Sequence, residues 1–317
     1  MGKGPGIVVT QLATPAINER QLDIRISSAT DVGGRADNED AIAVTELEPV
    51  DLGDGEPVGG LLLALADGMG GHQRGEVASQ IAIDTVQEVF AADPAGDVVP
   101  LLKQGFRRAN ELIHESWQGE AISQMMGTTL VVAATRGKYA TIASIGDSRA
   151  YLIRAGHLQQ ITRDHSLVAE QVAQGHMTLE EARESPHRNI ITHALGHKPR
   201  LDSRMPNVFE ITLLEEDRLL LLSDGFFDVI PDEDLLRLTS DADPESVASR
   251  LVSVAKERGT TDNVSAIVAT AIPRPNLALA TAQTSALSRQ TGAPILPVAA
   301  AILILVALAI VAYLALL

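Results

Sequence analysis

One apolar stretch and the glycine-rich loop that follows it constrain the fold of this chain more than any other segment. Residues 61–65 are all apolar, and they run directly into Ala66-Asp67-Gly68-Met69-Gly70-Gly71-His72-Gln73-Arg74-Gly75-Glu76. The apolar run indicates a buried strand that ends in a carboxylate. Glycine adopts backbone conformations that other residues avoid, so this loop allows the main chain to approach a ligand closely. The arrangement suits a metal ion held at the end of a strand.

The charge balance narrows the range of ligands. The chain has 317 residues, with 41 acidic against 25 basic side chains and a formal net charge of -16. Such a surface repels phosphate backbones, which argues against nucleic-acid binding, and it favours divalent cations. The chain contains no cysteine, which removes thiolate zinc sites and a cysteine nucleophile. The absence of cysteine is also typical of a reducing compartment.

Hydrophobic patterning predicts one mixed domain over residues 22–272, after an irregular lead-in at residues 1–21. Short strands are expected at 22–29, 41–46, 60–66, 128–135, 138–145, 149–154, 208–213, 217–222 and 263–271. Longer helices are expected at 75–91, 100–117 and 244–258. The polar residues 165–205 are interpreted as a mobile surface insertion with short helices near 166–174 and 178–184. Because helices and strands come in blocks, the α+β class is favoured over a doubly wound sheet.

The C-terminal residues 298–317 are 20 consecutive apolar residues. A helix of this length spans about 30 Å, the thickness of a bilayer core, which predicts a single transmembrane helix. The alternative, a buried terminal helix, would be expected to show an amphipathic face, and the segment has none. Residues 273–297 are rich in Pro, Ala, Ser and Thr and are expected to form a flexible linker. Arg274 and Arg289 precede the apolar segment and nothing basic follows it, which favours a cytoplasmic globular domain at the cell membrane.

Acidic clusters recur at the expected strand ends and turns. They are residues 30–40, Asp67-Gly68, Gly146-Asp147-Ser148-Arg149, residues 223–228 and residues 260–263. A single Asp-Gly pair is usually only a turn. Several clusters at strand ends are harder to explain in that way, because clustered carboxylates repel each other unless a cation neutralises them. Carboxylate oxygens are ligands that Mg²⁺ and Mn²⁺ prefer, so a metal centre is predicted.

These segments, in this order, resemble the metal-dependent protein phosphatases (the PPM, or protein phosphatase 2C, family), especially bacterial members. The matching pieces are Asp31-x-Gly33-x-Arg35-x-x-Asn38-Glu39-Asp40, Asp67-Gly68-Met69-Gly70-Gly71-His72-x-x-Gly75-Glu76, Gly127-Thr128-Thr129, Gly146-Asp147-Ser148-Arg149, Asp164-His165-Ser166, Ser223-Asp224-Gly225 and Asp262-Asn263. They cover roughly residues 22–272. The resemblance implies a four-layer αββα sandwich, in which two antiparallel sheets are flanked by helices and the metals lie at one end of the sheets.

The resemblance also implies a role for each site residue. Asp67 would bridge two Mn²⁺ or Mg²⁺ ions, with the Gly68 carbonyl as a further ligand. Asp224 and Asp262 would hold one ion and Asp40 the other, directly or through water. Asp147 would hold a third, weaker ion together with Asp224. Glu39 would be either a neighbouring ligand or a residue beside the ligands, and Asp31 and Asp228 are also expected around them.

The implied reaction is hydrolysis of phosphoserine and phosphothreonine esters in proteins. Two metals about 3.5–4 Å apart lower the pKa of a bridging water, and the resulting hydroxide attacks phosphorus without a covalent enzyme intermediate. Arg35 would bind two phosphate oxygens, although it could instead be a surface ion-pair residue. His72 would protonate the leaving alkoxide, although it could be an ordinary loop histidine. His165 is interpreted as structural, and Thr128 and Thr129 as strand hydroxyls that support the site.

The expected function is therefore that of a membrane-tethered phosphatase that counters a serine/threonine kinase in a bacterium. Its expected partners are phosphorylated proteins, that kinase and the membrane. One alternative is an inactive scaffold that binds phosphoproteins, but such a protein would lack a metal carboxylate and this chain has all of those expected. Another is a hydrolase of small phosphate esters or diesters. His193 stands where bacterial relatives often carry arginine, which leaves the substrate contacts of that segment open.

Overall fold

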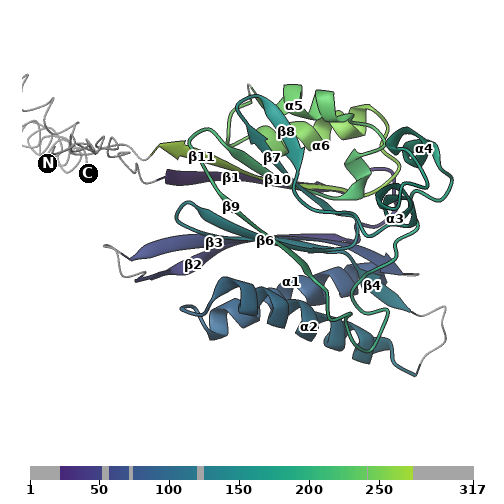
Figure 1. Ribbon diagram of the computed structural model, residues 1–317, viewed down its shortest axis with the longest axis horizontal. Coiled ribbons are helices and arrows are strands. Elements are labelled where there is room, and N and C mark those ends of the chain that lie inside the picture. Colours follow the sequence, from purple (N-terminus) through teal and green to yellow (C-terminus); the bar gives the residue numbers. More distant parts are fainter. Residues whose placement is uncertain (1–21, 52–56, 71–73, 120–124, 241, 274–317) are drawn as a thin grey trace, which may run out of the picture. The chain divides into compact units, whose positions relative to one another are not determined.

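Two antiparallel sheets stack face to face and carry helices on both outer sides (Figure 1). The computed structural model describes residues 22–51, 57–70, 74–119, 125–240 and 242–273. The first sheet has the strand order β1 (Leu22–Asp31), β11 (Val264–Pro273), β10 (Arg218–Leu222), β7 (Arg149–Arg154) and β8 (His157–Gln160). The second has the order β2 (Asp40–Val50), β3 (Val58–Gly70), β5 (Leu130–Arg136), β6 (Tyr139–Ile145) and β9 (Asn207–Thr212), and β4 (Met126–Thr128) pairs with the end of β3.

The helices form the outer layers of the sandwich. Two long helices, α1 (Arg74–Ala92) and α2 (Val98–Trp117), cover the second sheet, and α5 (Asp232–Ser240) and α6 (Val247–Glu257) cover the first (Figure 1). The short helices α3 (Leu167–Ala173) and α4 (Leu179–Glu184) belong to the segment between β8 and β9, and the 3₁₀ helix η2 (Asp224–Phe226) follows β10. The sandwich of two antiparallel sheets flanked by helices, which the family resemblance implies, is confirmed.

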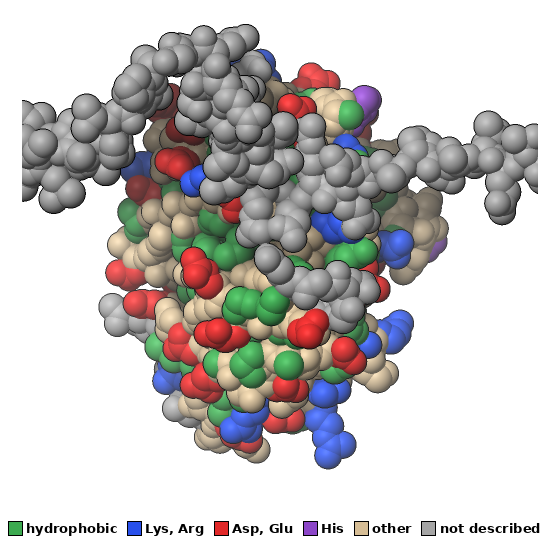
Figure 2. Space-filling view, turned by 90° about the vertical axis from the view of Figure 1, so that its left-hand side faces the viewer, with side chains coloured by type: hydrophobic (Ala, Val, Ile, Leu, Met, Phe, Trp, Pro, Cys, Tyr) green, Lys and Arg blue, Asp and Glu red, His purple; other side chains and the backbone are tan. Residues whose placement is uncertain are grey.

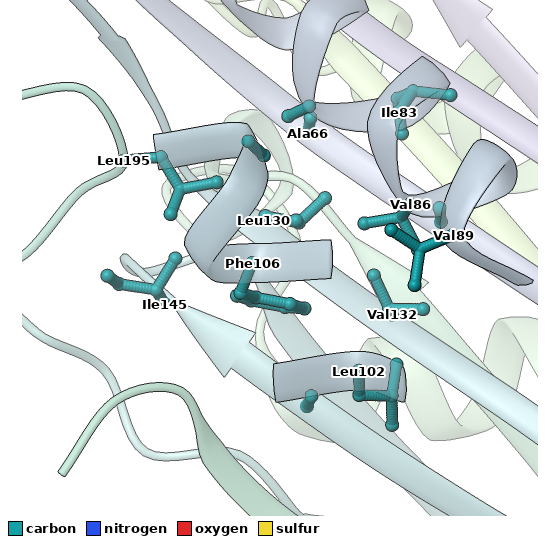
Figure 3. Close-up of a cluster of buried hydrophobic side chains, with 14 of the residues drawn as sticks. Ala66, Ile83, Val86, Val89, Leu102, Phe106, Leu130, Val132, Ile145 and Leu195 are labelled. Carbon is teal, nitrogen blue, oxygen red and sulfur yellow. The ribbon is translucent and has the colours of Figure 1, made fainter. Parts of the chain in front are cut away.

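Three buried apolar layers hold the sandwich together, and β3 contributes to two of them. Leu63 and Leu65 face the first sheet, whereas Leu62, Ala64 and Ala66 face α1 and α2. Side chains alternate between the two faces of a strand, so a strand covered on both faces reads as a continuous apolar run. This is the physical reason for the uninterrupted hydrophobicity of residues 61–66. Figure 3 shows the helix-side layer, in which Phe106 and Val86 from the two helices meet Leu130 and Val132 of β5.

Most of the expected elements are present, and the differences have local causes. The strand expected at 128–135 is divided into β4 and β5, because Thr129 leaves the ladder and its backbone N–H donates to the Asp67 carbonyl at 2.9 Å. The sequence did not indicate β8, since three of its four residues are polar and exposed. It did not indicate α5 either, because that helix has only nine residues, among which Leu235, Leu238 and Thr239 are buried.

The surface of the sandwich is acidic, as the net charge requires. Figure 2 shows the end at which β1 begins and β11 finishes, where acidic side chains are spread among hydrophobic and polar ones. No helix in the described ranges is long and apolar enough to cross a membrane. The expected transmembrane segment 298–317, the lead-in 1–21 and the linker 273–297, apart from Pro273 at the end of β11, lie outside the described residues.

The layer between the two sheets is expected to be the part of the core most sensitive to truncation. Leu63 is fully buried there, so Leu63→Ala should lower the free energy of unfolding by about 2–5 kcal/mol, through lost apolar burial and the cavity left behind. Leu214→Ala is the matched control, because Leu214 is 51% exposed and should cost less than about 0.5 kcal/mol. Urea unfolding followed by circular dichroism measures both. Equal losses in the two variants would contradict this account of the core.

Candidate metal centre

Strand ends from both sheets bring the predicted carboxylates to one end of the sandwich. Asp40 at the start of β2 is paired directly with Asp67 near the end of β3. Asp147 lies between β6 and β7, Asp224 follows β10 by two residues, and Asp262 precedes β11 by two. In an antiparallel sheet, the end of one strand lies beside the start of its neighbour. Residues that are far apart in the chain therefore meet at one end of the sheets.

These carboxyl groups are close enough to perturb one another. Burial raises the pKa of Asp67 well above its usual range, and the charges of Asp224, Asp40, Asp147 and Asp262 raise it further. Burial also raises the pKa of Asp40 to about 7, and the nearby serine hydroxyls offset only part of the rise. The pKa of Asp147 is raised to about 7 by burial and by Asp224, and that of Asp224 to about 6 by burial and by Asp262. The raised pKa values show that the ionised carboxylates repel one another in this site.

The donor set fits hard divalent cations. Both carboxylate oxygens of Asp40, and Oδ1 of Asp147, are buried without a hydrogen-bond partner of acceptable geometry in the described part of the chain. Buried carboxylates without a partner are costly, and a cation would satisfy them. As the described side chains stand, no three or more His, Asp or Glu residues are arranged to enclose a metal ion. Binding would therefore require these carboxylates to turn toward a common point.

The main chain around Asp67 is held firmly. The Asp67 N–H donates to Thr129 Oγ1 at 3.0 Å, and the Asp67 carbonyl accepts from the Thr128 hydroxyl at 2.8 Å. These bonds support the expectation that the two threonines brace the site. A Cβ at Gly68 would lie 2.1 Å from the carbonyl oxygen of Gly75, so the backbone can pass there only as glycine.

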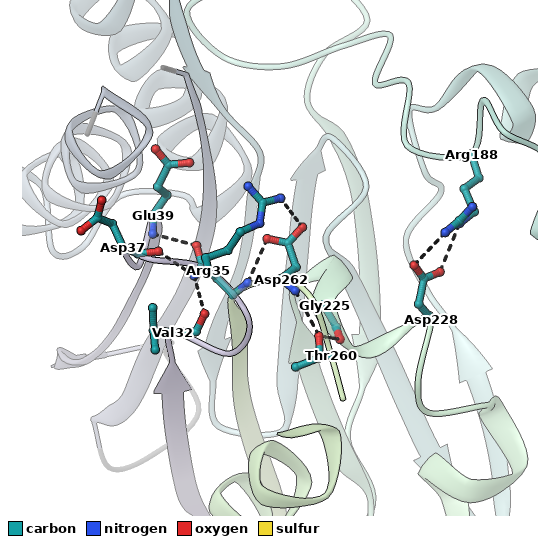
Figure 4. A network of polar contacts seen from close by, with 10 residues as sticks. Val32, Arg35, Asp37, Glu39, Arg188, Gly225, Asp228, Thr260 and Asp262 are labelled. Carbon is teal, nitrogen blue, oxygen red and sulfur yellow. Dashed lines mark hydrogen bonds and ion pairs between the residues drawn. The ribbon is translucent and has the colours of Figure 1, made fainter. Parts of the chain in front are cut away.

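Arg35 lies at the rim of the cluster and is ion-paired with Asp262. Its Nη2 donates to Asp262 Oδ2 at 2.6 Å, and this pairing raises the pKa of the guanidinium (Figure 4). The Arg35 side chain is 53% exposed, so it remains accessible to an anion. The loop that carries it packs tightly, because Gly33 has a φ of +57° and a Cβ there would lie 1.9 Å from the Asp262 carbonyl oxygen.

The three acidic residues expected around the ligands make other contacts. Asp31 accepts from Lys256 Nζ at 2.7 Å, and Asp228 forms an ion pair with Arg188 at 3.0 Å (Figure 4). The Glu39 carboxylate lies against Gly75 in the first turn of α1, where a Cβ would come within 2.6 Å of its carboxylate carbon. Burial raises the pKa of Glu39, and the Gly75 backbone amide opposes the rise. His72 lies outside the described residues.

One residue, Asn263, supports the site in a way that sequence reasoning did not assign. Asn263 accepts from the Glu39 N–H at 2.9 Å, and its amide donates to the carbonyls of Val32 and Asp37, which fixes the loop that carries Arg35. Its position beside Asp262 in the recurring motif was the available signal. His165 is buried, as its structural interpretation expects, and burial lowers its pKa to about 4.

Comparison with known proteins gives a consistent set of similarities. The sequence profile described as "Protein phosphatase 2C" matches residues 38–268. The chain is 37% identical over 252 residues to the serine/threonine protein phosphatase PstP of Mycobacterium tuberculosis, which covers 78% of this chain but only 45% of that relative. It is 39% identical over 211 residues to the protein phosphatase PhpP of Streptococcus pneumoniae, covering 65% of this chain and 84% of PhpP. The chain thus spans less than half the length of the mycobacterial relative.

Solved structures agree with the sequence comparison. The M. tuberculosis PstP/Ppp crystal structure has a TM-score of 0.67 and 35% identity, and the match covers 79% of this chain and 99% of that one. The PstP catalytic domain in complex with two manganese ions has a TM-score of 0.66 and 35% identity, with the same coverage. The Staphylococcus aureus phosphatase Stp1 has a TM-score of 0.70 and 35% identity, covering 78% of this chain and 95% of Stp1.

The raised pKa values make a specific prediction for the metal-free protein. The Asp147 carboxyl has a pKa of about 7 when folded and about 3.9 when unfolded, so folding loses stability as the pH rises between these values. In EDTA, the melting temperature of the wild type should therefore fall between pH 5.5 and pH 8. Asp147→Asn should remove part of this fall, equivalent to about 1–3 kcal/mol at pH 8. Parallel melting curves for the two proteins across this range would contradict the assignment.

Proposed function

The chain belongs to the protein phosphatase 2C family, and from this membership we propose that it hydrolyses phosphoserine and phosphothreonine esters in proteins. The observation that carries the proposal is the gathering of Asp40, Asp67, Asp224 and Asp262 at one end of the sandwich, with buried oxygens that have no partner of acceptable geometry in the described part. Such a cluster is unfavourable unless cations neutralise it. The cations proposed are two Mn²⁺ or Mg²⁺ ions, with a third, weaker ion beside Asp147.

The proposed roles follow from where the side chains lie. Asp40, Asp67, Asp224, Asp262 and the Gly68 carbonyl would hold the two cations. When bound, the cations would make a water molecule nucleophilic at neutral pH and offset the charge of the phosphate. Arg35 would orient the substrate, because its guanidinium presents paired donors that match two phosphate oxygens. A cation bound to Asp262 would compete with Arg35 for that carboxylate and leave the guanidinium available to the phosphate. His72 remains the proposed proton donor to the leaving alkoxide.

The decisive substitution is Asp67→Asn, which removes a charge from the middle of the cluster while keeping its shape. It should lower Mn²⁺-dependent release of phosphate from a phosphothreonine peptide by at least about a hundredfold. EDTA should silence the wild type, and added Mn²⁺ should restore it. The matched control is Asp84→Asn on the exposed face of α1, which should leave the rate unchanged within about twofold.

Three outcomes of these measurements would contradict the proposal. Full activity of the Asp67→Asn variant would exclude a metal-bridging role for Asp67. Faster turnover of small phosphate monoesters or diesters than of the phosphopeptide would indicate a different substrate class. A wild type that binds phosphopeptide and Mn²⁺ without releasing phosphate would indicate the scaffold alternative.

We also propose that the chain counteracts a serine/threonine kinase from the inner face of the cell membrane. In this arrangement, residues 22–272 form the phosphatase domain, residues 273–297 form a linker, and residues 298–317 span the bilayer once. Support comes from the 20 uninterrupted apolar residues and from the arginines that precede them. Tethering would confine the domain to substrates within reach of the linker.

Deletion of residues 295–317 tests the anchor. The truncated protein should move from the membrane fraction to the soluble fraction and retain the wild-type rate on a phosphopeptide within about twofold. The expected redistribution follows from the cost of exposing 20 apolar residues to water. Recovery of the full-length protein in the soluble fraction would refute the anchor and leave the proposed reaction untouched.

A further inference from the structure

The turn that carries Asp147 is held by two consecutive residues outside the carboxylate cluster, Asp164 and His165. This turn, residues 146–148, crosses from the second sheet to the first, because β6 belongs to one and β7 to the other. It lies outside both ladders, so regular strand pairing does not set its position. The position of the Asp147 carboxylate therefore depends on the contacts that the turn makes with its surroundings.

His165 holds the first residue of the turn by two hydrogen bonds. The Gly146 N–H donates to Nδ1 of the imidazole at 3.0 Å, and the His165 N–H donates to the Gly146 carbonyl at 2.9 Å. Gly146 has a φ of +97°, and a Cβ there would lie 2.5 Å from the Thr129 side chain. With no side chain of its own, Gly146 is held through its backbone. Because Nδ1 accepts, the neutral ring carries its proton on Nε2, which lies 2.8 Å from the Asn207 amide. This proton requires the Asn207 amide to turn its carbonyl oxygen, in place of Nδ2, toward the ring.

Asp164 holds the residue that follows the turn. The Arg149 guanidinium donates to the Asp164 carboxylate through Nε and Nη2, with a shortest distance of 2.7 Å. The same guanidinium lies over the ring of Phe227 at 3.8 Å from its centroid, and Phe227 directly follows η2, in which Asp224 lies. One pair of neighbouring residues thus fixes both ends of the segment around Asp147 and, through Arg149, contacts the segment that carries Asp224.

The same pair lies near the start of the segment between β8 and β9 and joins the turn to residues 190–192, farther along that segment. The His165 carbonyl accepts from the Thr192 N–H at 2.7 Å, and the Leu167 N–H donates to the Ile190 carbonyl at 2.9 Å. A displacement of residues 190–192 would therefore act on the backbone of His165, and the imidazole would pass it to Gly146. The contacts form a continuous path from this segment to Asp147.

We propose that His165, together with Asp164, is a positioning residue that sets the Asp147 carboxylate for the weaker third cation. The inference rests on the metal centre of the proposed function. It predicts that loss of the His165–Gly146 hydrogen bond weakens the binding of this third cation alone, because the strand ladder, and not this turn, holds Asp67 and Asp40. The two main cations should bind as before.

Two amide substitutions separate the two ring nitrogens. In His165→Asn, the side-chain oxygen lies near the position of Nδ1 and can still accept from Gly146. In His165→Gln, the longer side chain reaches the position of Nε2 and leaves the Gly146 N–H without its acceptor. Titration of Mn²⁺ into the metal-free full chain in detergent, followed by calorimetry and by the electron paramagnetic resonance signal of free Mn²⁺, measures the tight and weak classes of site.

His165→Gln is expected to lower the Mn²⁺ affinity of the weak class of sites by at least about tenfold and that of the tight class by less than about twofold. His165→Asn should stay within about threefold of the wild type in both classes. Asp147→Asn should abolish the weak class, and adding His165→Gln to that variant should change nothing further. Asn207→Ala is the control for the Nε2 side of the ring, and it should leave both classes within about twofold.

The proposal is overturned if His165→Gln matches the wild type, if it weakens both classes equally, or if His165→Asn behaves like His165→Gln. Thermal unfolding by circular dichroism checks that each variant folds. If the His165→Gln variant does not fold, Asp164→Asn tests the same turn from its other end and should again weaken only the weak class. A wild type without a weak class overturns this inference alone, whereas a wild type that shows both classes but releases no phosphate overturns only the proposed reaction.

Discussion

Repulsion among buried carboxylates is the constraint on which the rest of this structure depends. Asp40 and Asp67 face each other across a strand pair, and Asp224 is close enough to raise the pKa of Asp67. Charges of the same sign that lie close together in a buried site are unfavourable, because little water is present to screen them. The backbone cannot relieve the strain by moving apart, since both strands are fixed in register. Relief must come from protons, from a basic side chain or from bound cations.

The chain supplies only part of that relief itself. Arg35 forms an ion pair with Asp262 at the exposed rim, and Arg149 forms one with Asp164 beside the turn that carries Asp147. Neither guanidinium forms a hydrogen bond with the buried oxygens of Asp40. Cations fit this gap, because they can approach carboxylates from the open end of the sheets. The three apolar layers of the sandwich stabilise the fold around this unfavourable cluster.

The segment between β8 and β9 was expected to be a mobile surface insertion, and the structure shows how it is attached. Leu195 pairs with Thr128 beside the Asp67 backbone, and the Gly196 carbonyl accepts from the indole of Trp117 at 3.1 Å. Arg188 reaches Asp228 on the loop after η2. His193, which stands where relatives often carry arginine, packs its ring against that of His165 at 5.4 Å. The segment thus contacts the site from both sheets, and its contacts converge near the turn that carries Asp147.

The type of most elements and the chemistry of the site could be predicted from the order of the amino acids. Apolar runs that stop at an aspartate marked the buried strands and the residues at their ends, because burial and strand periodicity are local properties of a sequence. The sandwich fold was predicted from the order of the family motifs, because periodicity alone does not indicate which strands pair. The strands β4 and β8 have only three and four residues, which are too few to show a periodic pattern, and α5 was not predicted although it buries Leu235, Leu238 and Thr239.

The partner of each charged side chain, in contrast, became clear only from the packed fold. Asp31 and Asp228 were expected around the ligands, and the structure shows that Lys256 and Arg188 hold them in ion pairs. Arg35 meets Asp262 across 227 positions of the chain, and the imidazole of His165 fixes a turn that belongs to another sheet connection. A side chain's partner depends on distances of a few ångström between segments remote in sequence, and those distances exist only once the two sheets have packed.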